Sequence, residues 1–377
     1  MTNEKINKIL RTGGLHDVDT RFDVRDCDPI LPTRFYACEV LAIAMGMAGR
    51  SAANLWIERG GEDQGIALDT MGAACQLVGP WLQAIEGAPD PFRFQTAVTG
   101  IYGTADNRWI QLHGGYPHLL DGTCRFLGVS NDADEIESAT RCWQSDELED
   151  ALAESGMCAA VVRSAKEWAQ HPQGVAARAL PIVSIKRIGD GPPRPFSKAA
   201  RPLKGVRVLD FSRVIAGPSA ARTLAAFGAE VLNIRAEHLP FIESFIIFTG
   251  PGKRNAFLDL RDDANFRNLL QLVDRADVFI QSYRPGTLAR RGLGPEALAK
   301  WRPGIVYVSV SCFGGQGPWA HRGGWEQHAQ AVTGISSAQS GLVLNSQATE
   351  PHQELMLIPS ILSMCNPTGD ACASCVP

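Results

Sequence analysis

A short segment between a predicted strand and a predicted helix carries residues suited to holding an anion. Ser212–Pro218 (SRVIAGP) follows the apolar run Val206–Phe211 and precedes a helix-like run. Backbone N–H groups at a helix start and a nearby cation, here Arg213, can bind a phosphate or a carboxylate. The glycine-rich fingerprint of dinucleotide-binding loops is absent from this segment, which argues against a nicotinamide-dependent oxidoreductase.

A second basic segment follows another buried run. Arg284–Arg291 carries three arginines directly after the apolar Val278–Ile280. Their forked donors suit phosphate groups, although a solvated helix face would explain such a run taken alone. Lys253, Arg254 and Arg261 add positive charge between the two segments. Several basic loops in one half of the chain favour an anion-binding function.

The elements that position these loops alternate between strand and helix. This alternation predicts an α/β fold in the second half, a Rossmann-like doubly wound parallel sheet whose ligands bind beyond the carboxyl ends of the strands. The first half combines a helix-like run at Arg34–Leu55 with a hairpin at Gly103–His113, and predicts an α+β unit. The predicted strands of the second half are Val206–Phe211, Glu230–Ile234, Ala256–Leu260, Val278–Ile280 and Ile305–Val310, with helices at Pro218–Phe227, Leu269–Ala276 and Pro295–Trp301.

Changes of composition divide the chain into five segments. Residues 1–30 are a polar lead-in, 31–195 the α+β unit, 196–202 a linker, 203–341 the Rossmann-like half and 342–377 a divergent tail. The linker is the clearest boundary, because the prolines between Gly189 and Pro202 oppose both helix and central strand. The tail lacks strand–helix alternation and helical periodicity.

The composition of the chain restricts the classes of partner and the cellular compartment that we expect. A net charge of -4 and a pI near 6.1 provide no broad basic field, so we expect no nucleic acid partner. The ten cysteines are scattered and no signal peptide is recognised, so we expect reduced thiols in the cytoplasm. Cys372 and Cys375 form a C-x-x-C without a second ligand pair, which favours a chance pair over zinc. The apolar run Val40–Gly49 is half a bilayer span, so we expect a buried helix and no membrane.

Five motifs, in this order, resemble a known family. They are PLKGVRVLDFSRVIAGP at 202–218, FGAEV at 227–231, GKRNAFLDL at 252–260, RPG at 284–286 and GGQGP at 314–318. Together they are similar to the class III CoA-transferases of the CaiB/BaiF type, the carnitine dehydratase and bile-acid-inducible group. The resemblance covers about 130 residues, and no single motif would suffice.

The first half resembles a different part of the same family. Arg59–Asp69 (RGGEDQGIALD) is similar to a strand segment that family members carry after the nucleotide-binding half, and His171-Pro-Gln173 to a late segment. Residues 31–195 therefore resemble the back of a family member and 203–340 its front. This rotated order implies a permuted unit or a tandem fusion that has lost both ends.

The resemblance implies transfer of CoA from an acyl-CoA to a small carboxylic acid through a carboxylate nucleophile. The family's aspartate corresponds to Glu39, in the apolar run Ala37–Ala44, so the carboxylate is kept on a longer arm. A structural role for Glu39 on a helix surface is an equal alternative. Glu326 in GWEQHAQA resembles an aromatic–acid motif beside the active site, with a role in polar support or at the helix dipole. His328 is expected to have a packing or surface role rather than to bind metal.

The resemblance also assigns the CoA-binding positions. They are Arg213, Val214 and Ile215 in the first loop, Leu258 and Arg261 near the adenine end, and Ser282, Tyr283 and Arg290 in the later loop. Ala236 replaces an arginine common in the family, and the adjacent Arg235 is a possible compensation. CoA and acyl-CoA are substrates, and no prosthetic group is expected.

Family members form interlocked homodimers, so a homodimer is the expected assembly. A noncatalytic CoA-binding relative, or an inactive truncated fragment, remains the alternative. The front-half nucleophile segment should recur after Gly341, where only Glu350 and Glu354 offer weak substitutes. We therefore expect a truncated or frame-altered end.

Overall fold

The computed structural model describes residues 22–25, 30–31, 33–83, 86, 96–193, 195 and 197–340. The predicted tail, with Glu350 and Glu354, Cys372 and Cys375, and most of the lead-in lie outside these residues. The described chain forms two compact units, one from parts of Met1–Gln83 and Leu180–Val310, the other from parts of Ala84–Ala179 and Ser311–Leu362. We call them the parallel-sheet unit and the antiparallel-sheet unit. The five predicted segments stay a prediction.

A five-stranded sheet is the centre of the parallel-sheet unit. The strands are β6 (Arg207–Phe211), β7 (Glu230–Arg235), β8 (Lys253–Phe257), β9 (Val278–Gln281) and β10 (Val306–Ser309). Their spatial order is β10-β9-β6-β7-β8, and every neighbouring pair is parallel. The chain runs outward from β6 to β8 and then returns to place β9 beside β6, so the strand order reverses between β6 and β9. The predicted parallel sheet is confirmed.

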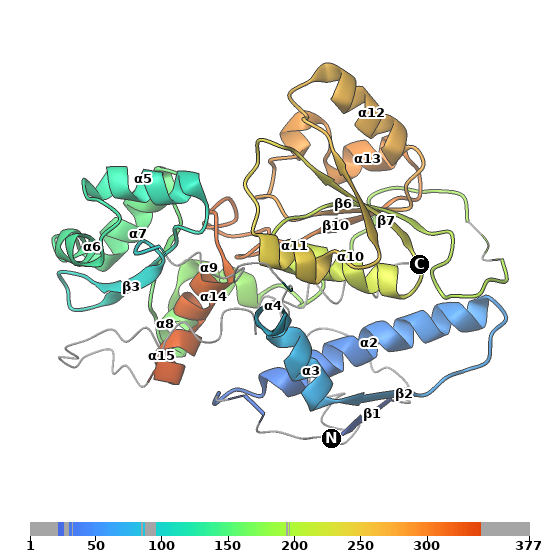
Figure 1. Cartoon of the computed structure of the whole chain (residues 1–377), viewed down its shortest axis with the longest axis horizontal. Helices are drawn as coiled ribbons and strands as arrows, with labels where there is room; N and C mark the ends of the chain where they lie inside the picture. The colour runs from blue at the N-terminus through green and yellow to red at the C-terminus, as the bar shows by residue number, and fades with distance from the viewer. Residues whose placement is uncertain are drawn as a thin grey trace. The chain divides into compact units, whose positions relative to one another are not determined.

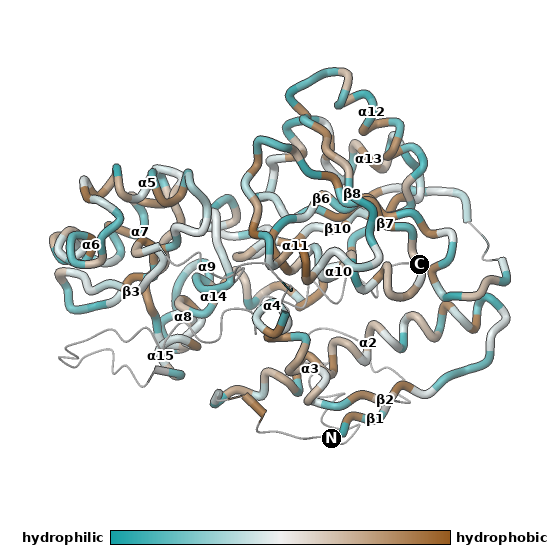
Figure 2. Tube along the Cα trace, viewed as in Figure 1, coloured by the Kyte–Doolittle hydropathy of each residue, from teal (hydrophilic) through white to brown (hydrophobic). Residues whose placement is uncertain are grey.

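Helices cover both faces of this sheet (Figure 1). Successive strand residues point to opposite faces, so Val208 packs with Leu224 of α10 in one core, whereas Leu209 packs with Leu269 of α12 in the other. Burial on both faces explains why the central strands β6 and β9 are mostly apolar. Hydrophobic residues line much of α11, where Phe248 is buried (Figure 2). The helices are α10 (Ala216–Ala226), α11 (Glu243–Thr249), α12 (Asp263–Val273), the 3-10 turn η1 (Ala289–Arg291) and α13 (Pro295–Trp301).

A long helix from the first half of the chain belongs to the same unit. Ala48 of α2 joins the core of α10, and Leu55 packs against it. By length and composition alone, this helix could also cross a membrane. The apolar run Val40–Gly49 lies within α2, which has 22 residues, and Leu41, Ile43 and Ala48 of this run are buried. The elements here are β1 (Phe22–Arg25), α2 (Ala37–Glu58), β2 (Ile66–Asp69), α3 (Thr70–Leu77) and α4 (Gly79–Leu82), with β1 parallel to β2.

A buried arginine holds the predicted linker. The guanidinium of Arg59, just after α2, donates to the carbonyl oxygens of Ser197 (2.7 Å), Pro202 (2.6 Å) and Lys204 (2.7 Å). Burial lowers the pKa of Arg59, yet three carbonyl acceptors compensate for part of the lost hydration. The segment leading into β6 is thus fixed to the end of α2.

The antiparallel-sheet unit contains the predicted hairpin. Strands β3 (Gly100–Gly103) and β4 (Trp109–Leu112) are antiparallel, and β4 also pairs with β5 (Ala159–Val161). Asn107 in the turn has φ 58°, a conformation that asparagine tolerates well. The helices of this unit are α5 (Pro117–Leu127), α6 (Ala133–Thr140), α7 (Ser145–Glu154), α8 (Ala165–Gln170), α9 (Pro172–Arg178), α14 (Glu326–Thr333) and α15 (Ile335–Ser340).

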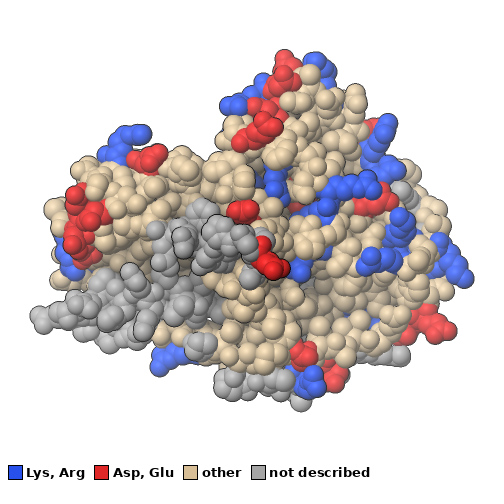
Figure 3. All heavy atoms as spheres, viewed as in Figure 1, with Lys and Arg blue, Asp and Glu red and all other residues tan. Residues whose placement is uncertain are grey.

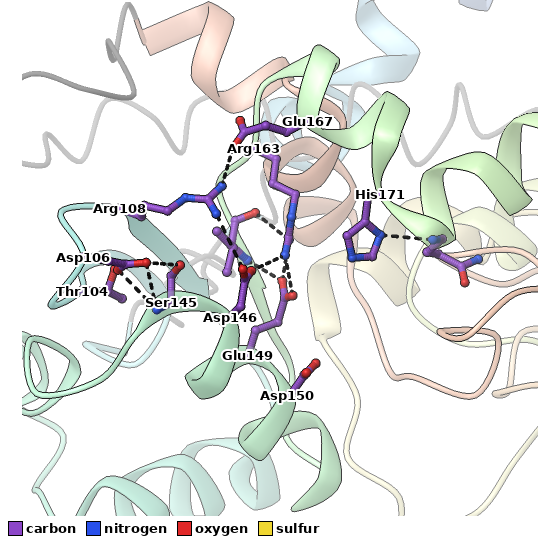
Figure 4. Close-up of polar contacts among 12 residues, drawn as sticks. Thr104, Asp106, Arg108, Ser145, Asp146, Glu149, Asp150, Arg163, Glu167 and His171 are labelled. Atoms are coloured by element: carbon purple, nitrogen blue, oxygen red, sulfur yellow. Dashed lines mark hydrogen bonds and ion pairs between the residues drawn. The ribbon is translucent and has the colours of Figure 1, made fainter.

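A charged network ties α7 and α8 to the strands (Figure 4). Arg163, after β5, binds Asp146 at 2.8 Å and Glu149 at 2.7 Å, and Arg108, before β4, binds Glu167 of α8 at 2.7 Å. Burial acts to lower the pKa of Arg163, but the hydrogen-bonded Glu149 and the charges of Asp146 and Glu167 together outweigh it, and the pKa is raised. The network therefore keeps the Arg163 charge inside the unit.

Candidate functional site

The loops after β6 and β9 meet where the strand order of the parallel sheet reverses. The backbone N–H of Arg213 donates to the Ser282 hydroxyl oxygen at 2.8 Å, and this hydroxyl lies 3.3 Å from the Arg213 carbonyl oxygen. Because β6 and β9 are parallel neighbours, both loops leave the same edge of the sheet. Such a reversal is where open α/β sheets bind ligands. The structure thus joins two of the segments predicted to bind CoA.

The first loop has an unusual backbone. Val214 has φ 68°, in the left-handed region that β-branched residues rarely adopt. Its neighbour Ile215 is buried and precedes α10, and the Arg213 guanidinium donates to the Pro240 carbonyl oxygen. Backbone strain of this kind persists only where the surroundings impose it, and it is concentrated at functional sites.

Close packing fixes where this loop enters α10. A Cβ atom on Gly217 would lie 2.3 Å from the Cβ of Ser212 and 3.5 Å from the Cβ of Ser282. Only glycine allows the helix start to come this close to Ser212, whereas the distance to Ser282 is an ordinary van der Waals contact. The Gly217-Pro218 pair quoted for the family resemblance therefore has a steric reason.

Positive charge surrounds the two loops. Burial raises the pKa of Tyr283, and the charges of Arg213 and Arg291 act against that rise. Burial also lowers the pKa of Arg222 and of Arg235, the latter opposed by Asp210. Figure 3 shows Lys and Arg side chains on the visible face of the part that carries the parallel sheet in Figure 1. Partly desolvated cations bind anions more strongly than exposed ones.

The remaining predicted CoA-binding residues lie further out in the same unit. The Leu258 N–H donates to the Arg235 carbonyl oxygen at 2.8 Å and continues the pairing of β8 with β7. Arg261 is exposed and binds Asp259 at 2.6 Å, and its hydrogen bonds hold the pKa of Asp259 far below its usual value. Arg290 is exposed in η1. Leu258 and Arg261 follow β8, an edge strand of the sheet. Strands β7 and β6 lie between β8 and β9.

The two candidate carboxylates lie in different units. Glu39 is in the first turn of α2, in the parallel-sheet unit, and is 3% exposed. Glu326 begins α14 in the antiparallel-sheet unit, and its carboxylate accepts a hydrogen bond from Gln330. The catalytic roles of Glu39 and Glu326 stay predictions.

Sequence reasoning missed two residues beside the first loop. Asp210 and Lys253 form an ion pair of 2.9 Å whose side chains are 0% and 2% exposed. The sequence pattern gave Lys253, Arg254 and Arg261 only as added positive charge and predicted no buried ion pair. The available signal was Asp210, a carboxylate inside the apolar strand run Val206–Phe211, which requires a buried partner.

His328 lies at the start of α14 and accepts a hydrogen bond from the Trp325 N–H at its Nδ1, 3.0 Å away. Its ring is fully enclosed, as expected for a packing residue. Among the described residues, no group of three or more His, Cys, Asp or Glu side chains could hold a metal ion.

Comparison with known proteins identifies a family match in the second half. The sequence profile described as CoA-transferase family III matches residues 203–353. A protein of Gibberella moniliformis named acyl-CoA transferase is 37% identical over 265 residues, which cover 63% of this chain and 45% of that protein. The succinyl-CoA:glutarate CoA-transferase of Mus musculus is 33% identical over 157 residues, 38% of this chain and 36% of that protein.

Solved structures include Rv3272 from M. tuberculosis, with 32% identity, a TM-score of 0.34 and coverage of 41% of this chain and 42% of that one. The chain spans less than half the length of the curated relatives named above.

Proposed function

Residues 203–353 belong to CoA-transferase family III, and from this premise we propose that the chain moves CoA from an acyl-CoA to a carboxylic acid. The observation that carries the proposal is the bond between Arg213 and Ser282, which joins two predicted CoA-binding loops at the strand reversal. The relatives named as acyl-CoA and succinyl-CoA:glutarate CoA-transferases support the reaction class.

The proposed CoA site occupies the carboxyl edge of the Rossmann-like sheet. The backbone N–H groups at the start of α10 and the cation Arg213 suit the negative phosphates. Ser282 and Tyr283 flank this loop on the β9 side, with Arg290 beyond them. Leu258 and Arg261 would lie toward the adenine end. Arg261 would have to exchange part of its bond with Asp259 for a phosphate oxygen.

We propose Glu39 as the nucleophile, with Glu326 in a supporting polar role. The Glu39 carboxylate would attack the acyl carbonyl carbon of the acyl-CoA. The C–S bond would then break to give a mixed anhydride and CoA thiolate. The thiolate would attack the Glu39 carbonyl, releasing the donor acid and leaving an enzyme thioester. The acceptor carboxylate would attack this thioester and expel the CoA thiolate, which gives a second mixed anhydride. The thiolate would then attack the acceptor acyl carbon of this anhydride, forming the new acyl-CoA and releasing the Glu39 carboxylate.

A noncatalytic CoA-binding protein is the second candidate. One observation favours it: glutamate stands at position 39, where the resemblance places the family's aspartate. One additional methylene moves a carboxylate by about 1 Å, enough to affect attack geometry. In either case we propose a cytoplasmic homodimer that acts on small molecules, with neither nucleic acid nor membrane as partner.

Calorimetric titration of the purified, mass-verified protein with CoA and with acetyl-CoA tests the proposal. We expect saturable binding of both, followed by transfer from acetyl-CoA to one member of a panel of acetate, oxalate, succinate and glutarate. Binding without transfer to any acid would select the noncatalytic candidate. A folded protein that binds neither thiol nor thioester would overturn both, and titration with NAD⁺ serves as the control.

A further inference from the structure

The ion pair of Asp210 and Lys253 contacts both ends of the Ser212–Pro218 loop. Lys253, at the start of β8, places its Nζ 2.9 Å from Asp210 Oδ2 on β6 and 2.6 Å from the Pro218 carbonyl oxygen on α10. Strand β7 lies between β8 and β6, so the lysine reaches across a whole strand. A single ammonium therefore links the sheet to the first turn of the helix that follows the loop.

The other carboxylate oxygen of Asp210 acts at the opposite end of the loop. Its Oδ1 accepts the backbone N–H of Ser212 at 3.0 Å and also the Ser212 hydroxyl. The two carboxylate oxygens of Asp210 thus bind different groups: Oδ1 binds Ser212, the first residue of the loop, and Oδ2 binds Lys253. Between these fixed ends lies Val214 with its positive φ. These contacts of Asp210 and Lys253 at the two ends of the loop explain how its strained backbone is maintained.

Stability alone is a poor explanation of this arrangement. Burial of two charges costs hydration that their attraction only partly restores, and apolar residues of similar volume often serve a fold as well. Burial lowers the pKa of Lys253, an effect that Asp210 opposes. The network also extends toward the cationic side of the site, because Asn233 donates to the Asp210 carbonyl oxygen at 3.0 Å and accepts from Arg235 at 2.6 Å.

We propose that Lys253 is a positioning residue for CoA binding. Acting through Asp210 and Pro218, it holds the Ser212–Pro218 loop in the conformation that presents Arg213 and the backbone N–H groups of α10 to the phosphates. This inference rests on the proposed function and adds a residue that does not itself touch the ligand.

The test compares the wild type with Lys253→Met and with the double variant Asp210→Asn, Lys253→Met. The single variant leaves a buried carboxylate unpaired and can fail to fold. The double variant removes both charges and keeps an acceptor for the Ser212 N–H. Calorimetry with CoA, below the unfolding transition, should give a Kd at least tenfold higher for the double variant. Hydrogen exchange of the Arg213–Ala216 amides in the free protein should be faster.

Arg302→Met is the matched control. Arg302 pairs with Asp277 at 3.3 Å beside the amino end of β9, away from the loop, so its loss should reduce stability and leave the CoA Kd within twofold. A Kd within twofold of wild type for the double variant, or an equal loss of affinity in Arg302→Met, overturns the positioning role while the proposed function stands. A wild type that does not bind CoA overturns the proposed function and, with it, this inference.

Discussion

The guanidinium of Arg163 binds the carboxylate of Glu149 through two hydrogen bonds of 2.7 Å each, from Nη1 to Oε1 and from Nη2 to Oε2. Both side chains are buried, at 5% and 2% exposed. Glu149 also accepts the Val161 N–H at 2.6 Å, and the Arg163 guanidinium lies 5.4 Å from the Trp319 ring centroid. The charged contact thus links helix α7 to the end of strand β5 (Figure 4), and the Trp319 ring, in the segment before α14, lies beside it.

Arg163→Met should strongly destabilise the antiparallel-sheet unit, because it leaves the Glu149 carboxylate buried without its cation. We expect the free energy of unfolding to fall by about 3–5 kcal/mol. The measurement is urea denaturation followed by tryptophan fluorescence. Arg141→Met is the control: its partner Glu137 is at 2.8 Å, but the pair is 46% and 29% exposed, so we expect a loss below about 1 kcal/mol. Equal losses of unfolding free energy in Arg163→Met and Arg141→Met would contradict the conclusion that burial makes the first ion pair the more important one for stability.

Gly217→Ala should weaken CoA binding, because its new Cβ would displace Ser212 and the loop that follows it. We expect a Kd for CoA higher by about tenfold or more, equivalent to about 1.4 kcal/mol. Overpacking should also reduce stability by about 1–3 kcal/mol. Calorimetry and urea denaturation measure the two effects. Gly315→Ala provides the comparison, since a Cβ there meets nothing within 4 Å. Wild-type affinity in Gly217→Ala would show that this close approach is not needed.

His328 should make folding sensitive to mild acid. Burial lowers its pKa from 6.5 to about 4, partly opposed by a hydrogen bond with the Cys158 backbone. The unfolded chain therefore takes up a proton more readily than the folded one. The contribution to stability is complete above about pH 6.5 and is lost as the pH falls toward about 4. Buried His113 also has a lowered pKa, caused mainly by burial, and acts in the same direction.

Urea denaturation at several pH values from 4 to 7.5 measures this dependence. His328→Asn keeps an acceptor for the Trp325 N–H. The free energy of unfolding should then depend less steeply on pH, by as much as the uptake of one proton, or about 1.4 kcal/mol per pH unit. His321→Asn is the control, because His321 is exposed. An unchanged slope in His328→Asn would assign the acid sensitivity to other groups.

Glu39→Gln should abolish CoA transfer if Glu39 is the nucleophile. We expect a loss of about 10³-fold or more in kcat and little change in the Kd for CoA. Glu326→Gln, the matched change at the supporting carboxylate, should reduce kcat by a smaller factor. Wild-type protein treated with acetyl-CoA should carry a hydroxylamine- or borohydride-sensitive adduct on Glu39, detectable by peptide mass spectrometry. An adduct on Glu326 would reverse the two assignments.

The parallel sheet was predictable because burial on both faces leaves apolar runs that polar loops interrupt. β6, β7, β9 and β10 lie within one residue of their predicted bounds, and α13 matches at both ends. The exception is β8, which covers Lys253–Phe257 and not Ala256–Leu260. It begins with a lysine that Asp210 neutralises inside the protein, and a sequence pattern treats that residue as solvent-exposed.

The candidate site was predictable only in part. The order of the family motifs indicated the loops of Arg213 and Ser282, but their direct hydrogen bond depends on which strands become neighbours. The positive φ of Val214 opposes its local preference and results from contacts at both ends of the loop. Likewise, the partners of Arg59 lie at residues 197–204, a separation at which sequence spacing says nothing about proximity.

The division into two units crosses the family-matched segment 203–353, since Val310 ends a part of one unit and Ser311 begins a part of the other. Ala331 of α14 accepts the Arg163 N–H at 2.9 Å and packs with Trp109. A shortened gene that starts at residue 203 would remove these partners, together with Arg59, and would leave apolar surface and backbone carbonyls exposed. Expression boundaries should therefore follow the three-dimensional contacts, because the family-matched segment alone would contain only part of each unit.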